Sequence, residues 1–347
     1  MTIIVRKPLD ESKKYIEKLQ GGEIMTLNVE NAFHLLDELT AEYAETHNDP
    51  YLDSLAILLR SLYEGNDTIV KDQNRFNNLK KMMESNGAEN ETIRKVIQLA
   101  LIKGMKGSVQ HQHVITPDSV AMFIGYFIQK LMKDEKSFRL FDPAVGAANL
   151  VTTVMNHVEA EIQAFGSEID PTLLQIAAAS ANIQQLSIEF FHQDSLQKLL
   201  LDPVDVVVAD LPIGYYPADR NAATFYLRAE EGHSYAHHLF IEQSVNYTRP
   251  GGFLLFLVPN FLFTSDQSEK LQQYIREFAH IVGFLQLPLS MFQSEKHGKS
   301  ILILQKKGEG TRPPKETLMA ALPSLKDPKK TYAILRQVDE WFKKERE

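Results

Sequence analysis

The hydrophobic residues of the first hundred positions recur every three or four residues, the spacing that places them on one face of an α-helix. Residues 29–63 show this pattern most clearly, and residues 67–87 continue it. Residues 92–103 form a further short helical pattern that ends at Gly104, because glycine is common at helix ends. We therefore predict an all-helical N-terminal domain over residues 1–108.

The pattern changes character after residue 107. Thr116 and Pro117 mark the start of a helix that runs to Lys133, because proline is preorganised for the first helical turn. Short runs rich in β-branched and aromatic residues predict seven strands, at residues 137–141, 161–167, 188–192, 204–209, 253–258, 281–287 and 300–305. The first five of these strands alternate with helical patterns such as residues 172–181, which is typical of a parallel sheet covered by helices on both faces.

The end of the predicted sheet departs from this alternation. Residues 288–299, which join the last two strands, have no helical period, so these strands are predicted to pair as an antiparallel hairpin. We expect an α/β fold over residues 109–310, with a Rossmann-like sheet of seven strands and this terminal antiparallel hairpin. Residues 311–347 are expected to form a tail with a short helix at 332–344. The aperiodic stretch 214–234 is long enough for a mobile lid.

Composition narrows the possible chemistry. The chain has no cysteine, which excludes disulfides, zinc–thiolate sites and cysteine nucleophiles. Its 37 basic and 45 acidic residues give a net charge of −8, which argues against broad adhesion to nucleic-acid phosphates but leaves a local basic patch open. No metal site is predicted, because neither His111 with His113 nor His237 with His238 is accompanied by a third ligand.

Targeting patterns point in one direction. No tract of 18 or more consecutive apolar residues is present, and the first residues lack a basic leader followed by an apolar stretch and a cleavage site. We therefore expect a cytoplasmic protein that does not associate with membranes.

Ligands of open α/β sheets bind beyond the carboxyl ends of the strands, so the residues that follow each strand are candidates for function. The first strand is followed by the small residues of 142–149, a turn in which backbone can approach a ligand closely. An ordinary strand-to-helix turn has the same appearance. After the second strand, Glu168 is placed to accept hydrogen bonds from a ribose diol, whereas Asp170, ahead of Pro171, is better placed to cap the next helix.

The third and fourth strands also end in acidic residues. Asp194 is either a ligand acceptor or the cap of a helix that starts near Ser195. Asp210 is followed by Leu211 and Pro212. An exocyclic amine is a poor nucleophile because its lone pair is delocalised into the ring, and an aspartate with a backbone carbonyl can hold both N–H groups and orient that lone pair. This end is the candidate reaction centre, with a turn-capping Asp210 as the alternative.

Taken in order, these four strand ends resemble the class I S-adenosylmethionine-dependent methyltransferases. They resemble more closely the adenine-N6 DNA methyltransferases typified by modification subunits of type I restriction systems. The resemblance covers residues 109–306. Thr116 matches an upstream cofactor element, residues 142–146 match the first cofactor motif, and residues 210–213 occupy the catalytic motif.

The resemblance implies S-adenosylmethionine as cofactor and a nucleic acid as substrate. It implies that Glu168 binds the cofactor ribose and that Asp194 accepts from the cofactor's adenine amine. Asp210, the Leu211 carbonyl and Pro212 would form the catalytic motif that positions the target amine. The cofactor contacts implied are Thr116, Asp142, Pro143, Ala144, Gly146, Asn149, Leu150, Glu168, Ile169, Asp194, Ser195 and Asp210.

The sequence departs from the family pattern in three places. Leu211 replaces a proline and Ile213 replaces the aromatic residue of the catalytic motif; base–aromatic stacking contributes about 1–3 kcal/mol, and Tyr215 or Tyr216 could supply the ring instead. Ala148 stands where the family often has a second glycine, which we expect to be tolerated only at an ordinary negative φ.

Two hypotheses of different class follow. The first is an N-methyltransferase acting on adenine in DNA, and the second is a non-catalytic S-adenosylmethionine-binding protein that has lost this chemistry. A nicotinamide oxidoreductase is disfavoured because the first turn lacks the Gly-x-Gly-x-x-Gly spacing. About forty residues follow the last predicted strand, fewer than a DNA-reading domain needs, so sequence-specific methylation would require a specificity subunit or a second copy of the chain.

Overall fold

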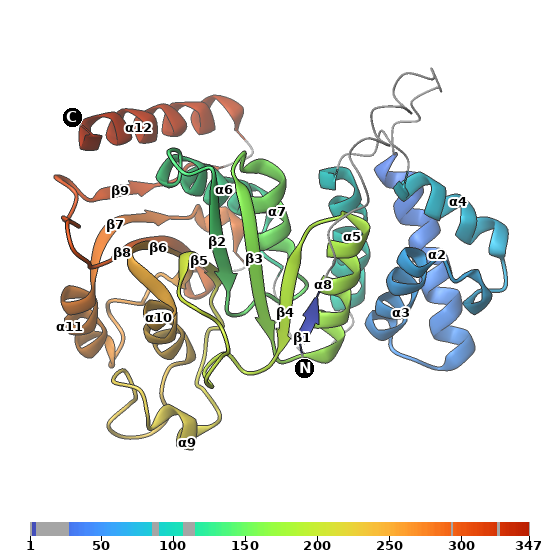
Figure 1. Ribbon diagram of the computed structural model, residues 1–347, viewed down its shortest axis with the longest axis horizontal. Helices are drawn as coiled ribbons and strands as arrows, with labels where there is room; N and C mark the ends of the chain where they lie inside the picture. The colour runs from blue at the N-terminus through green and yellow to red at the C-terminus, as the bar shows by residue number, and fades with distance from the viewer. Residues whose placement is uncertain are drawn as a thin grey trace. The chain divides into compact units, whose positions relative to one another are not determined.

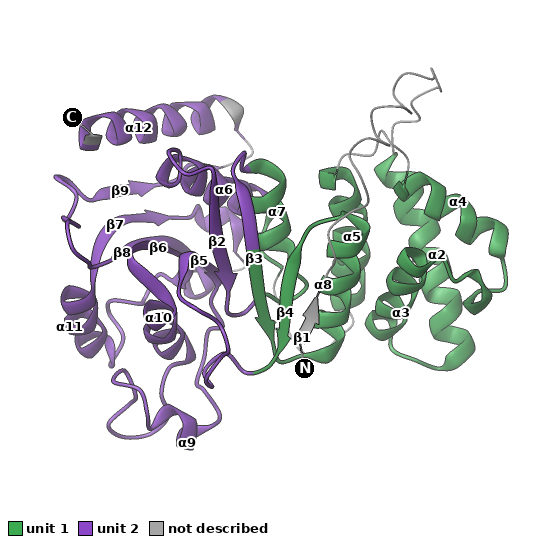
Figure 2. Cartoon of the chain, in the orientation of Figure 1, with its two compact units in different colours: residues 1–117, 145–157, 164–193 green, residues 118–144, 158–163, 194–347 purple. Residues whose placement is uncertain are grey.

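The computed structural model describes residues 2–4, 28–84, 90–106, 115–292, 294–324 and 327–346. Its chain divides into two compact units, each assembled from separate stretches of sequence (Figure 2). Unit 1 comprises residues 1–117, 145–157 and 164–193, and unit 2 comprises residues 118–144, 158–163 and 194–347. His111 and His113, which were considered as metal ligands, lie outside the described residues.

The N-terminal part of unit 1 is helical, as predicted. The pattern over residues 29–63 forms two helices, because Asn48 adopts a left-handed φ of 55° that ends the first one. The Asn28 side chain caps the start of that helix by accepting a hydrogen bond from the Asn31 N–H at 3.0 Å. The elements are α2 (Val29–His47), α3 (Tyr51–Glu64), the 3₁₀ turn η1 (Asp67–Ile69), α4 (Gln73–Glu84) and α5 (Asn90–Met105) (Figure 1).

A single hydrophobic core joins these helices to a helix from much later in the chain. Leu36, Leu55 and Leu59 are fully buried, and Leu173 and Ile176 of helix α8 (Pro171–Ile183) belong to the same cluster. Burial of a leucine side chain contributes roughly 1.5–3 kcal/mol. The helical region therefore shares one hydrophobic core with α8, in which its buried apolar side chains pack.

Unit 1 also contains strands and the helix that follows the first candidate motif. Strand β3 (Glu161–Glu168) enters this unit at Ala164, pairs in parallel with β4 (Ile188–His192), and ends opposite it, Glu168 facing His192. Strand β1 (Thr2–Ile4), which the sequence pattern did not predict, pairs antiparallel with β4. The remaining helix is α7 (Asn149–His157).

Unit 2 contains a mixed sheet in the order β2, β5, β6, β8, β7, β9. The β5 strand pairs in parallel with β2 and with β6, whereas β8 runs antiparallel to both β6 and β7. The predicted antiparallel pairing of the last two strands is confirmed, as are all seven predicted strands; β9 is an addition. The strands are β2 (Ser137–Asp142), β5 (Val204–Asp210), β6 (Thr248–Pro259), β7 (Ala279–Gln286), β8 (Lys299–Lys306) and β9 (Leu318–Ala321).

Helices of unit 2 include the predicted C-terminal one, α12. It is fastened to α6 through Asp339, which accepts from the Tyr126 hydroxyl at 2.7 Å and pairs with Lys130 at 2.6 Å. None of the helices in the described parts of the chain is long and apolar enough to cross a membrane. The helices are α6 (Asp118–Leu131), α9 (Asp219–Ala222), α10 (Ala236–Asn246), α11 (Ser268–Phe278) and α12 (Pro328–Arg346), with 3₁₀ turns η2 (Leu289–Met291) and η3 (Glu295–His297).

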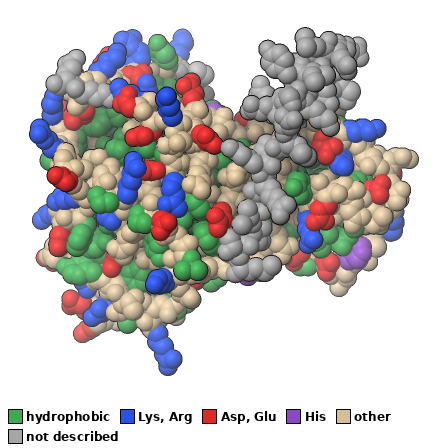
Figure 3. Space-filling view, in the orientation of Figure 1, with side chains coloured by type: hydrophobic (Ala, Val, Ile, Leu, Met, Phe, Trp, Pro, Cys, Tyr) green, Lys and Arg blue, Asp and Glu red, His purple; other side chains and the backbone are tan. Residues whose placement is uncertain are grey.

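The stretch 214–234, expected to be a lid, is held by contacts at several points. The Glu242 carboxylate of α10 accepts from the backbone N–H groups of Tyr226 and Leu227 at 2.9 and 2.7 Å. Tyr215 and Tyr235 form an isolated antiparallel bridge at the two ends of the stretch. On the face drawn in Figure 3, basic and acidic side chains are interspersed rather than gathered into a patch of one sign.

Candidate functional site

The turn after β2 is fixed by hydrogen bonds within unit 2. The buried Asp142 carboxylate, at the end of the strand, accepts from the Ala144 N–H at 2.9 Å. The Ser195 hydroxyl donates to the Pro143 carbonyl at 2.5 Å. Four of the sequence-predicted contacts are therefore structural supports of the turn as well as candidates for ligand binding.

The Glu168 carboxylate, in unit 1, is oriented by hydrogen bonds from backbone N–H groups. It accepts from the Gly146 N–H at 2.9 Å and from the N–H groups of Ile169 and Asp170 at 2.8 and 2.9 Å. Gly146 has a φ of 54°, and apart from its chain neighbours no atom of the described residues lies within 4 Å of the place that a Cβ there would take. The carboxylate is thus oriented by three backbone amides beside open space, an arrangement suited to a hydroxyl-rich ligand.

The expectation for Ala148 is wrong. Its φ is 64°, in the left-handed region rather than at an ordinary negative value, and its side chain is completely buried. The Ala148 N–H donates to the Val145 carbonyl at 2.8 Å, closing a turn immediately before α7. Entry into α7 demands the left-handed conformation, which costs an alanine about 1–2 kcal/mol.

Asp170 has the capping role that the sequence indicated. Its Oδ1 accepts from the N–H groups of Thr172 and Leu173 at 2.8 and 3.0 Å, ahead of Pro171 at the first position of α8. This assignment leaves Glu168 as the acidic side chain of that strand end that is a candidate for ligand binding.

Asp194 follows β4 and is already engaged by the protein. Its Oδ1 accepts from the Leu196 N–H at 2.9 Å, which caps a turn and not the helix considered above. Its Oδ2 accepts from the Tyr216 hydroxyl at 2.5 Å. Burial and this hydrogen bond raise the pKa of Tyr216 to about 12, so the phenol remains a donor at neutral pH. Tyr216 is therefore an unsuitable stacking ring, being 7% exposed and bonded to Asp194.

Asp210 closes strand β5, with an ion-pair partner that the sequence did not reveal. Lys299 Nζ lies 2.5 Å from Asp210 Oδ1, and the two side chains are 16% and 13% exposed. Lys299 is the first residue of β8 and stands opposite Pro259 of β6, whereas Asp210 stands opposite Leu257 of the same strand. Sequence reasoning missed Lys299 because its reach depends on the register of three strands.

The residues after Asp210 include Tyr215, one ring of a stacked aromatic pair. Tyr215 is 58% exposed and stacks on Tyr235, with ring centroids 4.9 Å apart and an interplanar angle of 12°. Ile213, in the position where the family has an aromatic residue, is also exposed. Of the two tyrosines considered as replacements for the missing ring, Tyr215 alone is accessible.

His237 and His238 are buried at the start of α10, and their ring nitrogens have no hydrogen-bond partner within the described part of the chain. Burial lowers the pKa of His237 to about 3 and that of His238 to about 4. Both rings are therefore neutral at physiological pH. No group of three or more potential ligands for a metal ion occurs among the residues that the structure describes.

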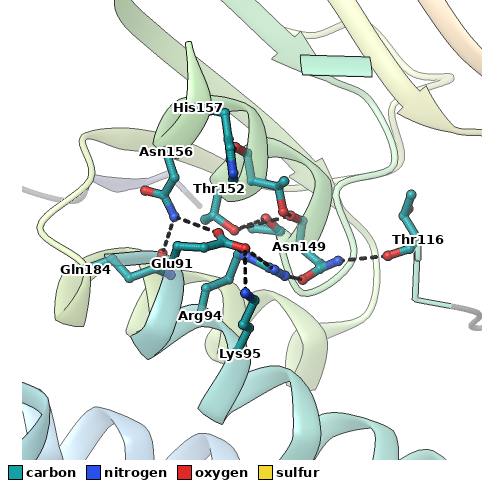
Figure 4. A network of polar contacts seen from close by, with 11 residues as sticks. Glu91, Arg94, Lys95, Thr116, Asn149, Thr152, Asn156, His157 and Gln184 are labelled. Atoms are coloured by element: carbon teal, nitrogen blue, oxygen red, sulfur yellow. Dashed lines mark hydrogen bonds and ion pairs between the residues drawn. The ribbon is translucent and has the colours of Figure 1, made fainter. Parts of the chain in front are cut away.

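Asn149 opens α7 and belongs to a polar network in unit 1 (Figure 4). Its Oδ1 accepts from the Arg94 guanidinium of α5, and its Nδ2 donates to the Thr116 carbonyl at 2.9 Å. The amide is thus used at both ends, so the Asn149 side chain acts as a support rather than as a free ligand group.

The residues present fit an adenosine-containing cofactor. In unit 1, Glu168 provides an oriented carboxylate beside the open space at Gly146; in unit 2, Asp194 provides a second acceptor for a donor group. Carboxylates of this kind bind ribose hydroxyls and amines.

The fold and these strand ends define a class I S-adenosylmethionine-dependent methyltransferase. The family model described as N-6 DNA Methylase matches residues 105–338, so the chain belongs to the N-6 DNA methylase family. Its cofactor is S-adenosylmethionine. A second family model, the YtxK N-terminal helical domain, matches residues 30–105.

Three similar proteins illustrate this membership. The protein YtxK of Bacillus subtilis (strain 168) is 51% identical over 259 residues, which are 74% of this chain and 79% of that protein. A structure from Listeria monocytogenes, described as a candidate class I S-adenosylmethionine-dependent methyltransferase, is 39% identical with a TM-score of 0.82, covering 90% of this chain and 98% of that one. The methyltransferase subunit of a type I restriction-modification system from Streptococcus thermophilus shares the fold, with 12% identity, a TM-score of 0.59 and coverage of 91% and 74%.

Proposed function

We propose that this protein transfers a methyl group from S-adenosylmethionine to the exocyclic amine of a nucleobase, with adenine in DNA as the leading substrate. The observation that carries the proposal is Asp210, an acceptor at the carboxyl end of β5 in a member of the N-6 DNA methylase family. In parallel α/β sheets this end of the strands is where ligands bind.

Both units contain residues that we propose as cofactor contacts. In unit 1, Glu168 would accept from the ribose hydroxyls, and Gly146 would allow close approach of the backbone. In unit 2, Asp194 would accept from the adenine amine of the cofactor. The further contacts that we propose, several of them through backbone, are Thr116, Asp142, Pro143, Ala144, Asn149, Leu150, Ile169, Ser195 and Asp210.

S-adenosylmethionine supplies an activated methyl group when bound. The chain's part is to present the amine: the Asp210 carboxylate accepts one N–H and the Leu211 carbonyl the other, next to Pro212, so that the nitrogen lone pair is directed out of the ring plane. Formation of the N–C bond would break the bond between the methyl group and the cofactor sulfur and would give the nitrogen positive charge. The Asp210 carboxylate would stabilise that charge until the nitrogen releases one proton to water. Lys299 fixes the direction of that carboxylate through the 2.5 Å ion pair.

The substrate ring needs a surface to lie against. Tyr215 is the exposed aromatic side chain two residues beyond Ile213, and its stacking on Tyr235 holds the ring in a defined plane. Base–aromatic stacking contributes about 1–3 kcal/mol. Because the net charge is −8 and the face in Figure 3 has mixed charges, we propose that stable binding to DNA requires a partner subunit or a second copy of the chain.

A second candidate function is binding of S-adenosylmethionine without methyl transfer. One contact favours it: the ammonium group of Lys299 pairs with Asp210, the acceptor that methyl transfer would need. Leu211 is buried. Because it stands in place of a proline, the backbone of the motif also lacks the rigidity that proline gives.

The two candidates are separated by incubating the purified protein with methyl-labelled S-adenosylmethionine and, separately, DNA, RNA and protein from a methylation-deficient source. Label in DNA supports the leading proposal. Binding of the cofactor by calorimetry with no label in any acceptor supports the second, and label confined to RNA or protein overturns the assignment of DNA.

A further inference from the structure

Arg94 of helix α5 is a buried arginine in the helical region, 2% exposed. Its Nε and Nη2 donate to the two carboxylate oxygens of Glu91, at 2.8 and 2.6 Å, so the pair is bidentate. Its Nη1 donates to the Asn149 Oδ1 at the start of α7. Although burial raises the pKa of Glu91, the hydrogen bond and the charge of Arg94 bring that pKa below its usual value, so the pair is ionised at neutral pH.

Asn149 connects Arg94 to the proposed cofactor loop. It lies three residues after Gly146 and one after the left-handed Ala148. Because Arg94 can only donate and the Thr116 carbonyl can only accept, the amide of Asn149 has one orientation that satisfies both (Figure 4). A side chain of the helical region thereby fixes the residue at which the loop becomes helix α7.

Packing alone does not require this arrangement. A buried ion pair is costly to desolvate, and apolar side chains of similar volume usually stabilise a core at least as well. The contact between the helical region and α8 is apolar around Leu55, Leu173 and Ile176, with the Thr172 hydroxyl donating to Asp53 as a polar contact. The buried Arg94–Glu91 pair lies instead against the start of α7, where the loop containing Gly146 ends, which indicates a positional rather than a purely stabilising role.

We propose that Arg94 is a positioning residue through which the helical region controls the affinity of the cofactor loop for S-adenosylmethionine. The proposal rests on the proposed binding of the cofactor by Gly146 and Glu168. Loss of the Arg94 contact would free the Asn149 side chain, loosen the strained turn at Ala148, and misalign the Gly146 N–H that orients the Glu168 carboxylate.

The test is calorimetric titration of S-adenosylmethionine into the full chain and three variants. Arg94→Met removes the charge, and Asn149→Ala removes the acceptor while leaving the Arg94–Glu91 pair intact. One charge-assisted hydrogen bond corresponds to a change of about 10-fold to 100-fold in affinity, and we expect a weakening in this range for each. Lys103→Met is the matched control: it removes a charged contact of the same helix, to Asp37 at 2.5 Å, and should leave cofactor affinity unchanged.

A double variant, Arg94→Met with Asn149→Ala, should bind no more weakly than the weaker single variant, because both act through one contact. If Arg94→Met fails to fold, judged by its thermal transition, the result for Asn149→Ala decides. Unchanged affinity in a folded Asn149→Ala variant overturns the proposal. Failure of the unaltered protein to bind S-adenosylmethionine instead overturns the proposed function on which it rests.

Discussion

The proposed role of Asp194 as acceptor of the cofactor's adenine amine leads to a prediction about Tyr216, whose hydroxyl donates to the same carboxylate: removal of that hydroxyl should increase cofactor affinity. The phenol donates to Asp194 Oδ2 at 2.5 Å, while Oδ1 retains the Leu196 N–H. An adenine amine that binds at Oδ2 would compete with this bond for the same oxygen. Because the pKa of Tyr216 is raised to about 12, ionisation of the phenol does not remove the competition in the working range of pH.

The size of the effect follows from the chemistry of the bond. A hydrogen bond from a neutral donor to a carboxylate contributes about 1.5–3 kcal/mol. Tyr216→Phe should lose about that much stability without cofactor, and the ring should stay in place because it is buried. The variant has no bond to break on binding, so its dissociation constant for S-adenosylmethionine should fall by about tenfold, which is about 1.4 kcal/mol.

Isothermal titration calorimetry of Tyr216→Phe, with a thermal melt of the free protein, measures both changes. Tyr126→Phe is the matched control, because its hydroxyl also donates to a carboxylate, Asp339, at 2.7 Å. The control should lower the melting temperature and leave the dissociation constant unchanged. Weaker or equal binding by a folded Tyr216→Phe variant would refute competition at Asp194.

Three further predictions concern other parts of unit 2 and the loop. Lys299→Met should lower the rate constant of methyl transfer about tenfold with unchanged cofactor affinity, because the carboxylate of Asp210 loses its fixed direction. Faster transfer would instead show that the native Lys299–Asp210 ion pair hinders transfer, as the second candidate function implies. Because the pKa values of His237 and His238 are lowered to about 3 and 4, the unfolded chain binds more protons below pH 6.5, and unfolding free energy should fall on acidification. At pH 5 each ring should lower the unfolding free energy by about 2 kcal/mol. The urea midpoints at pH 7 and pH 5 should therefore differ less in a variant with His237→Phe and His238→Leu than in the unaltered protein; an equal difference in the two proteins would exclude these rings as the cause. Ala148→Gly should raise the unfolding free energy by about 1 kcal/mol through relief of the left-handed strain, and a lower melting temperature would show that its buried methyl group contributes more.

Local patterns in the sequence were sufficient for the elements of the fold. The seven predicted strands and the antiparallel hairpin are present because alternation, branched residues and loop length report on local structure. Strand β1 was missed because three residues are too few for a periodic pattern, and β9 because it lies in a segment rich in glycine, proline and lysine. The single helical pattern over residues 29–63 became two helices because Asn48 can adopt a left-handed conformation.

The candidate site was predictable as a set of strand ends but not as a set of contacts. The capping role of Asp170 could be assigned from the proline that follows it, because capping is a local property. The partners Lys299 and Tyr216 could not, since they lie 89 and 22 positions away from the aspartates that they contact. Arg94 was equally hidden, because a single arginine in a helical pattern resembles an exposed one until the packing of α5 is known.

The most direct test of the central claim is nucleoside analysis of DNA after reaction with methyl-labelled S-adenosylmethionine. We expect label in N6-methyladenine with the unaltered protein and none with Asp210→Ala, while calorimetry shows nearly equal cofactor affinity in the two proteins. Equal labelling by Asp210→Ala, or label at a carbon or oxygen atom, would contradict the assignment of Asp210 as the group that presents the amine.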